Sequence, residues 1–143
     1  MSIEGKVIIV TGGTSGIGEG CTRHFAELGA KVVTASIQEE EGRALEQELR
    51  HAGHEVAFVY TDVSDEESVK ALVDKTLELH GRIDGAHSNA CVVAKGKVTD
   101  FSEDDWDLMM GVNVKGNFYF AKHLVPVFEK QGEGVLVITT SVA

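Results

Sequence analysis

A strand, a glycine-rich turn and the start of a helix follow one another within residues 6–20, KVIIVTGGTSGIGEG, and this order restricts the fold more than any other stretch. Val7–Val10 is a run of β-branched aliphatic residues, which is typical of a strand buried on both faces and is too short for a helix. Gly12, Gly16 and Gly18 come where such a strand would have to reverse into a helix. Because glycine adopts positive φ and lets other groups approach the backbone closely, the stretch predicts a tight turn from strand to helix.

The start of that helix is a candidate binding site for an anion. The first N–H groups of a helix have no partner within the helix, and the helix dipole is positive at the same end. These features suit the pyrophosphate of a dinucleotide. The spacing is G-x-x-x-G-x-G rather than the usual G-x-G-x-x-G, so a purely structural turn is the alternative interpretation.

Length and composition restrict the class of protein. The chain has 143 residues, enough for one domain with a sizeable core, and its 43% hydrophobic and 25% charged residues argue against a disordered chain. The net charge of −10 and the scattered positions of the 13 lysines and arginines argue against nucleic-acid binding. No apolar run approaches the roughly 18 residues that cross a bilayer. Met1–Gly5 has no signal-peptide pattern, so we expect a cytoplasmic protein that does not enter a membrane.

Cysteines and histidines give no sign of a disulfide framework or a metal site. Cys21 and Cys91 are far apart, and the six histidines occur singly, without H-E-x-x-H. We therefore predict reduced thiols and no bound metal. His87 stands in an otherwise apolar stretch, where a satisfied core histidine is favoured over a catalytic one.

Strands and helices are expected to alternate along the whole chain. The expected strands cover residues 7–10, 31–36, 55–60, 83–90 and 135–139. The expected helices follow the glycine turn as far as Gly29, cover residues 39–50, run from Ser64 to Gly81 and extend over residues 106–128. This alternation predicts an α/β fold with one doubly wound, Rossmann-like parallel sheet. We expect a single domain, residues 1–143, that is truncated after the fifth strand and incomplete at its C-terminal end.

Local patterns specify how three of these helices begin or pack. An apolar stripe predicts the face of the first helix that packs on the sheet, and it consists of Ile17, Cys21, Phe25 and Leu28. Residues 64–67, SDEE, predict a capping box in which Ser64 accepts from the third helical amide. Residues 102–105, SEDD, predict a similar cap for the last helix.

Polar and glycine residues follow the ends of the expected strands. In a doubly wound sheet the ligand lies at the carboxyl ends of the strands, where the strand order reverses. The residues at or just past these ends are Thr11–Gly18, Ser36, Asp62, Asn89 and Ser141. We expect them to converge on one crevice.

Several stretches together resemble the short-chain dehydrogenase/reductase family. The octet TGGTSGIG, residues 11–18, resembles the cofactor signature of that family. Asp62-Val63 follows the third strand, where the family has an acidic residue directed at the adenine, and SNAC, residues 88–91, stands where the family has N-N-A-G. The segment WDLMMGVNVKG resembles the one that holds the active-site Asn, here Asn113, and GVLVITTSVA resembles the strand that ends in the catalytic Ser, here Ser141.

The resemblance implies an oxidoreductase that transfers a hydride between a nicotinamide cofactor and a small alcohol or ketone. Ser141 would hydrogen-bond the substrate oxygen, and Asn113 would anchor a water in a proton relay. The residues that the resemblance assigns to the cofactor are Thr11, Gly12, Thr14, Ser15, Gly16, Ile17, Gly18, Ser36, Asp62, Val63, Asn89, Ala90 and Cys91. Cys91 replaces a family glycine and Ser88 replaces the first asparagine of the motif.

The family also uses a tyrosine as general acid or base, with a lysine four residues later that lowers its pKa. Four residues after Tyr60 and Tyr119 stand Ser64 and His123, so this pair is absent. We expect the N-terminal, cofactor-binding part of a longer reductase, which is inactive alone. The alternative is a catalytically inactive dinucleotide-binding or interaction module. The last strand would be an uncovered apolar edge, which predicts a homo-oligomer.

The cofactor is expected to be NAD or NADP. An acidic residue after the second strand would bind a ribose 2′-hydroxyl, and a basic one would bind a 2′-phosphate. The residues at that position are Ser36, Ile37 and Gln38, of which none is acidic or basic. Glu39–Glu41 follow closely and would repel a 2′-phosphate, which favours NAD; their alternative role is that of ordinary acidic residues at a helix start.

Overall fold

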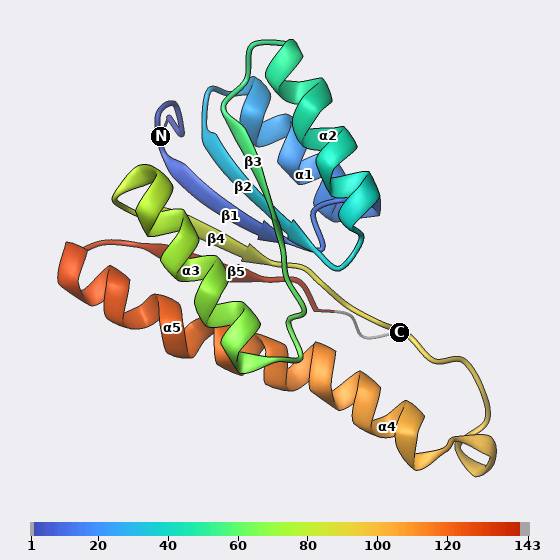
Figure 1. Cartoon of the computed structure of the whole chain (residues 1–143). Coiled ribbons are helices and arrows are strands. Elements are labelled where there is room, and N and C mark those ends of the chain that lie inside the picture. Colours follow the sequence, from blue (N-terminus) through green and yellow to red (C-terminus); the bar gives the residue numbers. More distant parts are fainter. Residues whose placement is uncertain (1, 141–143) are drawn as a thin grey trace.

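A parallel sheet with helices on both faces makes up residues 2–140, which are the residues that the computed structural model describes (Figure 1). The strands are β1 (Val7–Thr11), β2 (Lys31–Ser36), β3 (Val56–Tyr60), β4 (Gly85–Ser88) and β5 (Val135–Ile138). The helices are α1 (Gly16–Glu27), α2 (Glu39–His51), α3 (Glu66–His80), η1 (Val98–Asp100), α4 (Glu103–Met110), η2 (Gly111–Lys115) and α5 (Gly116–Gln131). The predicted α/β, doubly wound architecture is confirmed.

The strand order reverses beside the first strand. Across residues 2–140 the sheet has the order β3-β2-β1-β4-β5, and every pairing is parallel. The chain moves outward from β1 to β3, then crosses to the other side of β1 for β4 and β5. The carboxyl ends of β1 and β4 therefore flank the switch point, where ligands bind in sheets of this kind.

Apolar side chains fill both faces of the sheet. Within the described residues, one core cluster joins the sheet to α3 and α5, and its members include Ile9, Val33, Leu72, Phe120 and Leu124. The other joins the sheet to α1 and α2, and its members include Ile8, Val10, Val32, Leu45 and Leu49. Alternate residues of β1 thus serve opposite faces, and every residue of this strand is buried, as its aliphatic run predicts.

Helix α1 packs on the sheet through small residues rather than through the predicted apolar stripe. Its buried residues are Gly18, Thr22 and Ala26. Ile17 is 67% exposed and Leu28 is 49% exposed, so the predicted stripe is wrong at both ends, although Cys21 and Phe25 pack at the margin of the core. The reason is the close approach of the helix to the turn, because a Cβ on Gly18 would collide with the Gly12 carbonyl oxygen.

The N-cap of α3 is Asp65, one residue later than predicted. The Asp65 carboxylate accepts hydrogen bonds from the N–H groups of Glu67 and Ser68. The Ser64 hydroxyl instead donates to the Asp62 carboxylate, and Asp65 takes the capping position. The predicted cap of the last helical stretch is confirmed, since Ser102 and Asp105 form a capping box.

The single helix predicted for residues 106–128 is interrupted. The π-helical segment η2 separates α4 from α5, and the helical path continues past Pro126 to Gln131. Strand β4 is also shorter than predicted. Its ladder ends at Ser88 because the next two amides, those of Asn89 and Ala90, donate to the Thr11 hydroxyl.

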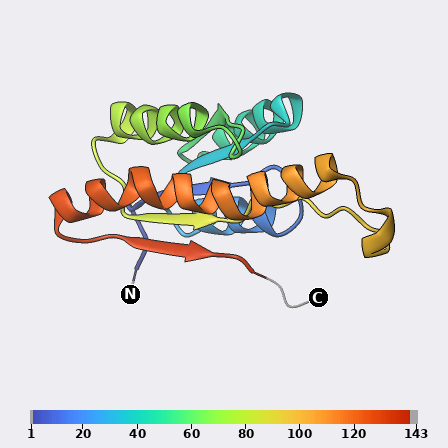
Figure 2. The same cartoon turned by 90° about the horizontal axis from the view of Figure 1, so that it is seen from below.

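Strand β5 forms an open edge of the sheet. Figure 2 shows it as the outermost strand on its side, with α5 alongside. An apolar run of this kind is typical of a buried strand, but Val135, Val137 and Ile138 are 55%, 53% and 42% exposed. The strand is therefore the uncovered apolar edge that the sequence predicts. Among residues 2–140, no helix has the length and apolarity that crossing a bilayer requires.

Candidate cofactor-binding site

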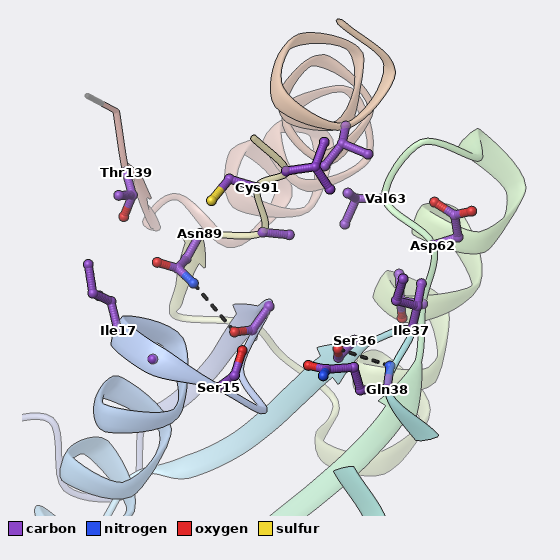
Figure 3. A pocket seen from close by; sticks show the side chains of 16 residues that line it. Ser15, Ile17, Ser36, Ile37, Gln38, Asp62, Val63, Asn89, Cys91 and Thr139 are labelled. Carbon is purple, nitrogen blue, oxygen red and sulfur yellow. Dashed lines mark hydrogen bonds between the residues drawn. The ribbon is translucent and has the colours of Figure 1, made fainter. Parts of the chain in front are cut away.

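A cavity of about 500 Å³ lies at the carboxyl ends of the strands (Figure 3). Its lining residues come from the turn after β1, from the ends of β2, β3, β4 and β5, and from η2. They are Gly12, Ser15, Gly16, Ile17, Ser36, Ile37, Gln38, Thr61, Asp62, Val63, Asn89, Ala90, Cys91, Val92, Val112 and Thr139. The structure therefore brings together ten of the thirteen residues that the sequence assigns to the cofactor, while Thr11, Thr14 and Gly18 lie behind the lining.

The glycine turn leaves room for a ligand at the start of α1. Gly12 and Gly16 have φ of +62° and +52°, a conformation that L side chains rarely adopt. A Cβ on Gly12 would lie 2.8 Å from the Ala90 Cα, so this glycine permits close packing of the turn on the segment after β4. A Cβ on Gly16 would meet nothing within 4 Å. Gly16 therefore faces open space within the cavity, beside the first amides of α1, and the turn fits a pyrophosphate.

Thr11 and Asn89 join the turn to β4. The buried Thr11 Oγ1 accepts hydrogen bonds from Asn89 N at 3.0 Å and from Ala90 N at 3.2 Å. In return Asn89 Nδ2 donates to the carbonyl oxygens of Thr11 and Gly12, at 3.3 and 3.4 Å. Thr11 thus holds the cavity wall without lining it.

A polar network closes the end of β2. Thr14 Oγ1 lies 2.9 Å from both Ser36 Oγ and Gln38 Oε1, and Gln38 N donates to Ser36 Oγ at 3.1 Å. Thr14 is buried behind Ser36, which explains why it does not reach the cavity surface. Among the described residues that line the cavity there is no lysine or arginine. This end of the cavity therefore offers neutral hydroxyl and amide groups.

Asp62 and Val63 lie at the side of the cavity formed by the segment after β3 (Figure 3). Asp62 Oδ1 accepts from Ser64 N at 2.9 Å and from Ser64 Oγ at 2.7 Å. Val63 is buried and packs against Gly116, where a Cβ would lie 3.2 Å from the Val63 Cβ. The absence of a side chain at Gly116 lets α5 approach this wall of the cavity.

Asn113 lies in η2 and does not line the cavity. Its Nδ2 donates to the Val92 carbonyl oxygen at 2.8 Å, and its Oδ1 accepts from Val92 N at 2.9 Å. Its own carbonyl oxygen accepts from Asn117 Nδ2 at 2.6 Å. The side chain therefore fixes the segment after β4 to the helix, and Val92 in turn lines the cavity. Ser141 lies outside the described residues.

A histidine and a threonine connect β4 to β5 at the far end of the cavity. His87 Nε2 lies 2.7 Å from Thr139 Oγ1. His87 is 9% exposed, and this burial lowers the pKa of its imidazole. His87 is thus a buried histidine with a partner on one ring nitrogen, whereas the sequence interpretation expected a fully satisfied one.

Sequence reasoning missed several lining residues. Ile37 and Gln38 enter the sequence prediction only through the cofactor preference, and no motif assigns Thr61, Val92, Val112 or Thr139 to the site. Thr61 and Thr139 each come directly after a strand, a position that could have identified them. Val112 carries no such signal, because its place depends on how η2 folds over the cavity. In the described part of the chain, no three His, Cys, Asp or Glu side chains are placed to hold a metal ion.

Comparisons with known proteins agree with this geometry. The family model of the short chain dehydrogenases matches residues 6–143. An uncharacterized oxidoreductase of Thermotoga maritima is 41% identical over 143 residues, which is all of this chain and 56% of the relative. The (+)-borneol dehydrogenase 1 of Salvia officinalis is 41% identical over 141 residues, 97% of this chain and 53% of the relative. The chain thus spans about half the length of these relatives.

Solved structures of short-chain dehydrogenases are similar to this chain as well. A short-chain dehydrogenase/reductase from Burkholderia phymatum in complex with NAD superposes with a TM-score of 0.96 at 37% identity, over 99% of this chain and 51% of that one. A metagenomic short-chain oxidoreductase in complex with NADP gives a TM-score of 0.93 at 30% identity, over 100% of this chain and 65% of that one. With a family match over nearly its whole length and the fold of these relatives, the chain belongs to the short-chain dehydrogenase family.

Proposed function

We propose that this chain is the cofactor-binding part of an oxidoreductase that moves a hydride between a nicotinamide dinucleotide and an alcohol or ketone. The observation that supports it most is Gly16, whose α-carbon faces open space beside the first amides of α1, inside a cavity that spans the ends of all five described strands. A strand-to-helix turn with a purely structural role would not require a cavity that joins it to the ends of the other strands. The chain's own residues would bind and orient the dinucleotide, which supplies the hydride chemistry when bound.

Each part of the cavity suits one part of the ligand. The glycine turn and the first amides of α1 would hold the pyrophosphate. Ser36 and Gln38 would hydrogen-bond the adenosine ribose, and Asp62 with Val63 would border the adenine. Asn89, Ala90 and Cys91 would border the second nucleoside. The remaining assigned residues support these contacts: Thr11, Thr14 and Gly18 from behind the lining, Ser15 and Ile17 within it.

The catalytic roles of Ser141 and Asn113 remain proposals that rest on the family resemblance. Ser141 would hydrogen-bond the substrate oxygen. Asn113 would stabilise the proton relay, in addition to its bonds with Val92. Because Tyr60 and Tyr119 have no lysine four residues later, we propose that a tyrosine and lysine outside this sequence complete the reaction. A binding module without catalysis is the second candidate, favoured by the same lack of that pair.

NAD is the proposed cofactor. The described residues lining the cavity include no lysine or arginine that could neutralise a 2′-phosphate. The first turn of α2, next to Gln38, carries Glu39, Glu40 and Glu41, which would repel that phosphate. The relatives include one structure with NAD and one with NADP, so the preference rests on these local charges.

The test is calorimetric titration of the chain with NAD and NADP, on the wild type and on Gly16→Ala and Gly20→Ala. Gly20 is the matched control, since it lies in α1 and a Cβ there also meets nothing within 4 Å. At Gly16 the new Cβ stands in the cavity and the positive φ becomes strained. We expect Gly16→Ala to weaken NAD binding at least about tenfold, with Gly20→Ala unchanged. Equal binding by both variants, or no binding of either cofactor by the folded wild type, would refute the proposal.

A further inference from the structure

A hydrogen bond between His87 and Thr139 crosses from β4 to β5. His87 stands directly opposite Val137 in the parallel register. Thr139 follows Val137 by two residues and so lies on the same face of the sheet. This places Thr139 Oγ1 2.7 Å from His87 Nε2. The side chain of Thr139 also lines the cavity, so one hydroxyl borders both the histidine and the space for the ligand.

The tautomer of His87 follows from its other ring nitrogen. Nδ1 is buried and has no hydrogen-bond partner among the described residues. A neutral imidazole carries one N–H, and burial, which lowers the pKa of His87, favours this neutral form. Within the described part of the chain, Nδ1 is unpaired in either tautomer, as a donor or as an acceptor, and a buried N–H without a partner is the rarer of the two in native proteins. The N–H therefore belongs on Nε2, from which it donates to Thr139 Oγ1.

This assignment fixes the role of the Thr139 hydroxyl. Its oxygen accepts the hydrogen bond from His87, so its own hydrogen is left for another acceptor. Thr139 is exposed at the cavity and lies across from Asn89 in Figure 3. We infer that Thr139, oriented by His87, donates a hydrogen bond to the ligand at the β4–β5 end of the cavity.

The inference rests on the proposed function and identifies the part of the ligand concerned. With the pyrophosphate at the glycine turn, the adenosine lies over the ends of β2 and β3. The second nucleoside then lies over β4 and β5, and the carboxamide oxygen of its nicotinamide is a suitable acceptor. Thr139 is thus a binding residue, and His87 is a positioning residue that acts through it.

The first experiment measures the tautomer without any ligand. Nitrogen-15 NMR of the labelled wild-type chain distinguishes a protonated from an unprotonated ring nitrogen, and His87→Gln identifies the signals. We expect a protonated Nε2 and an unprotonated Nδ1 at neutral pH. A proton on Nδ1 would mean that Thr139 donates to the histidine instead, and this result would overturn the inference regardless of the function.

The second experiment compares Thr139→Val and Thr139→Ser in calorimetric titrations with NAD and with ADP-ribose, which lacks the nicotinamide. Valine keeps the shape of threonine and removes the hydroxyl, whereas serine keeps the hydroxyl. We expect Thr139→Val to weaken NAD binding about three- to tenfold, which is the effect of one hydrogen bond, and to leave ADP-ribose binding unchanged. Thr139→Ser should bind NAD within about twofold of the wild type.

The outcomes separate this inference from the proposed function. If Thr139→Val weakens the binding of NAD and of ADP-ribose equally, or affects neither, the donor role of Thr139 is overturned. NAD binding by the wild type would still support the proposed function. A wild type that binds neither ligand overturns both. Thermal unfolding of each variant verifies that the fold is intact, and a loss of NAD affinity in Thr139→Ser equal to that in Thr139→Val also counts against the inference.

Discussion

The hydroxyl of Thr11 accepts a hydrogen bond from the amide of Asn89 at 3.0 Å, and this bond joins the end of β1 to the end of β4. Because the strand order reverses between these two strands, the bond spans the switch point itself. The same oxygen accepts from the Ala90 amide at 3.2 Å. One buried side chain thus holds together the two segments that form the centre of the cavity.

Replacing Thr11 should therefore destabilise the protein. Thr11→Val removes the acceptor and leaves two amides without their partner, so we expect the free energy of unfolding to fall by about 2 kcal/mol. Urea denaturation measures this loss. Thr11→Ser keeps the hydroxyl and is the control, expected to lose less than half as much. Equal losses in the two variants would show that the methyl group, rather than the hydroxyl, matters.

A cation at the end of β2 should change the cofactor preference. Ile37 is 58% exposed and lines the cavity, and it takes no part in the hydrogen bonds between Thr14, Ser36 and Gln38. Ile37→Arg would place a guanidinium beside the ribose, where it can pair with a 2′-phosphate. We expect NADP affinity to rise about tenfold relative to NAD in calorimetric titrations. Ile37→Gln is the neutral control, and a similar gain in that variant would contradict the charge argument.

Two histidines whose pKa is lowered by burial should make the protein less stable in mild acid. Burial lowers the pKa of both His80 and His87 below the ordinary 6.5. As the pH falls below 6.5, the unfolded state takes up protons before the folded state does, so stability decreases, by at most about 1.4 kcal/mol per pH unit for each histidine. Urea denaturation between pH 7 and 5 measures the slope. The double variant His80→Gln, His87→Gln should show a smaller change of stability with pH. An unchanged slope would show that these two histidines do not cause the loss of stability.

The open edge of the sheet should cause self-association. Val135, Val137 and Ile138 expose apolar surface on an unpaired strand, which is a template for pairing with a second chain. We expect wild-type chain at high concentration to scatter light as an oligomer, and Val137→Lys to shift it toward the monomer. Val125→Lys, on the exposed side of α5, is the control. A monomeric wild type, or an equal effect of both lysines, would contradict a role for β5.

The features that could be predicted from the sequence are those that depend on residues close together along the chain. The aliphatic run of β1, the alternation of strands and helices and the capping box at Ser102 all follow from local patterns, and all are confirmed. The cavity could be predicted as well, because in a parallel α/β sheet the ends of the strands must meet at one edge. Ser36, Asp62 and Asn89 accordingly come together.

The errors concern relations between distant parts of the chain. The packing face of α1 is determined by the collision that a Cβ on Gly18 would have with Gly12, which hydrophobic periodicity does not represent. The cap of α3 is Asp65, whose carboxylate accepts from the amides of Glu67 and Ser68, while Ser64 pairs with Asp62. The partner of His87 is 52 residues away, so the role of Thr139 emerges only when β4 and β5 lie side by side.

The lack of lysine and arginine among the described lining residues has a consequence for binding kinetics. The chain carries a net charge of −10, yet none of the described residues that face the ligand space is a lysine or arginine. An anionic coenzyme would therefore approach against a repulsive field and be captured by short-range contacts with backbone amides and uncharged polar side chains. Added salt weakens that repulsion at a distance. The association rate should consequently rise with ionic strength, the reverse of the behaviour of proteins that attract phosphates with lysines.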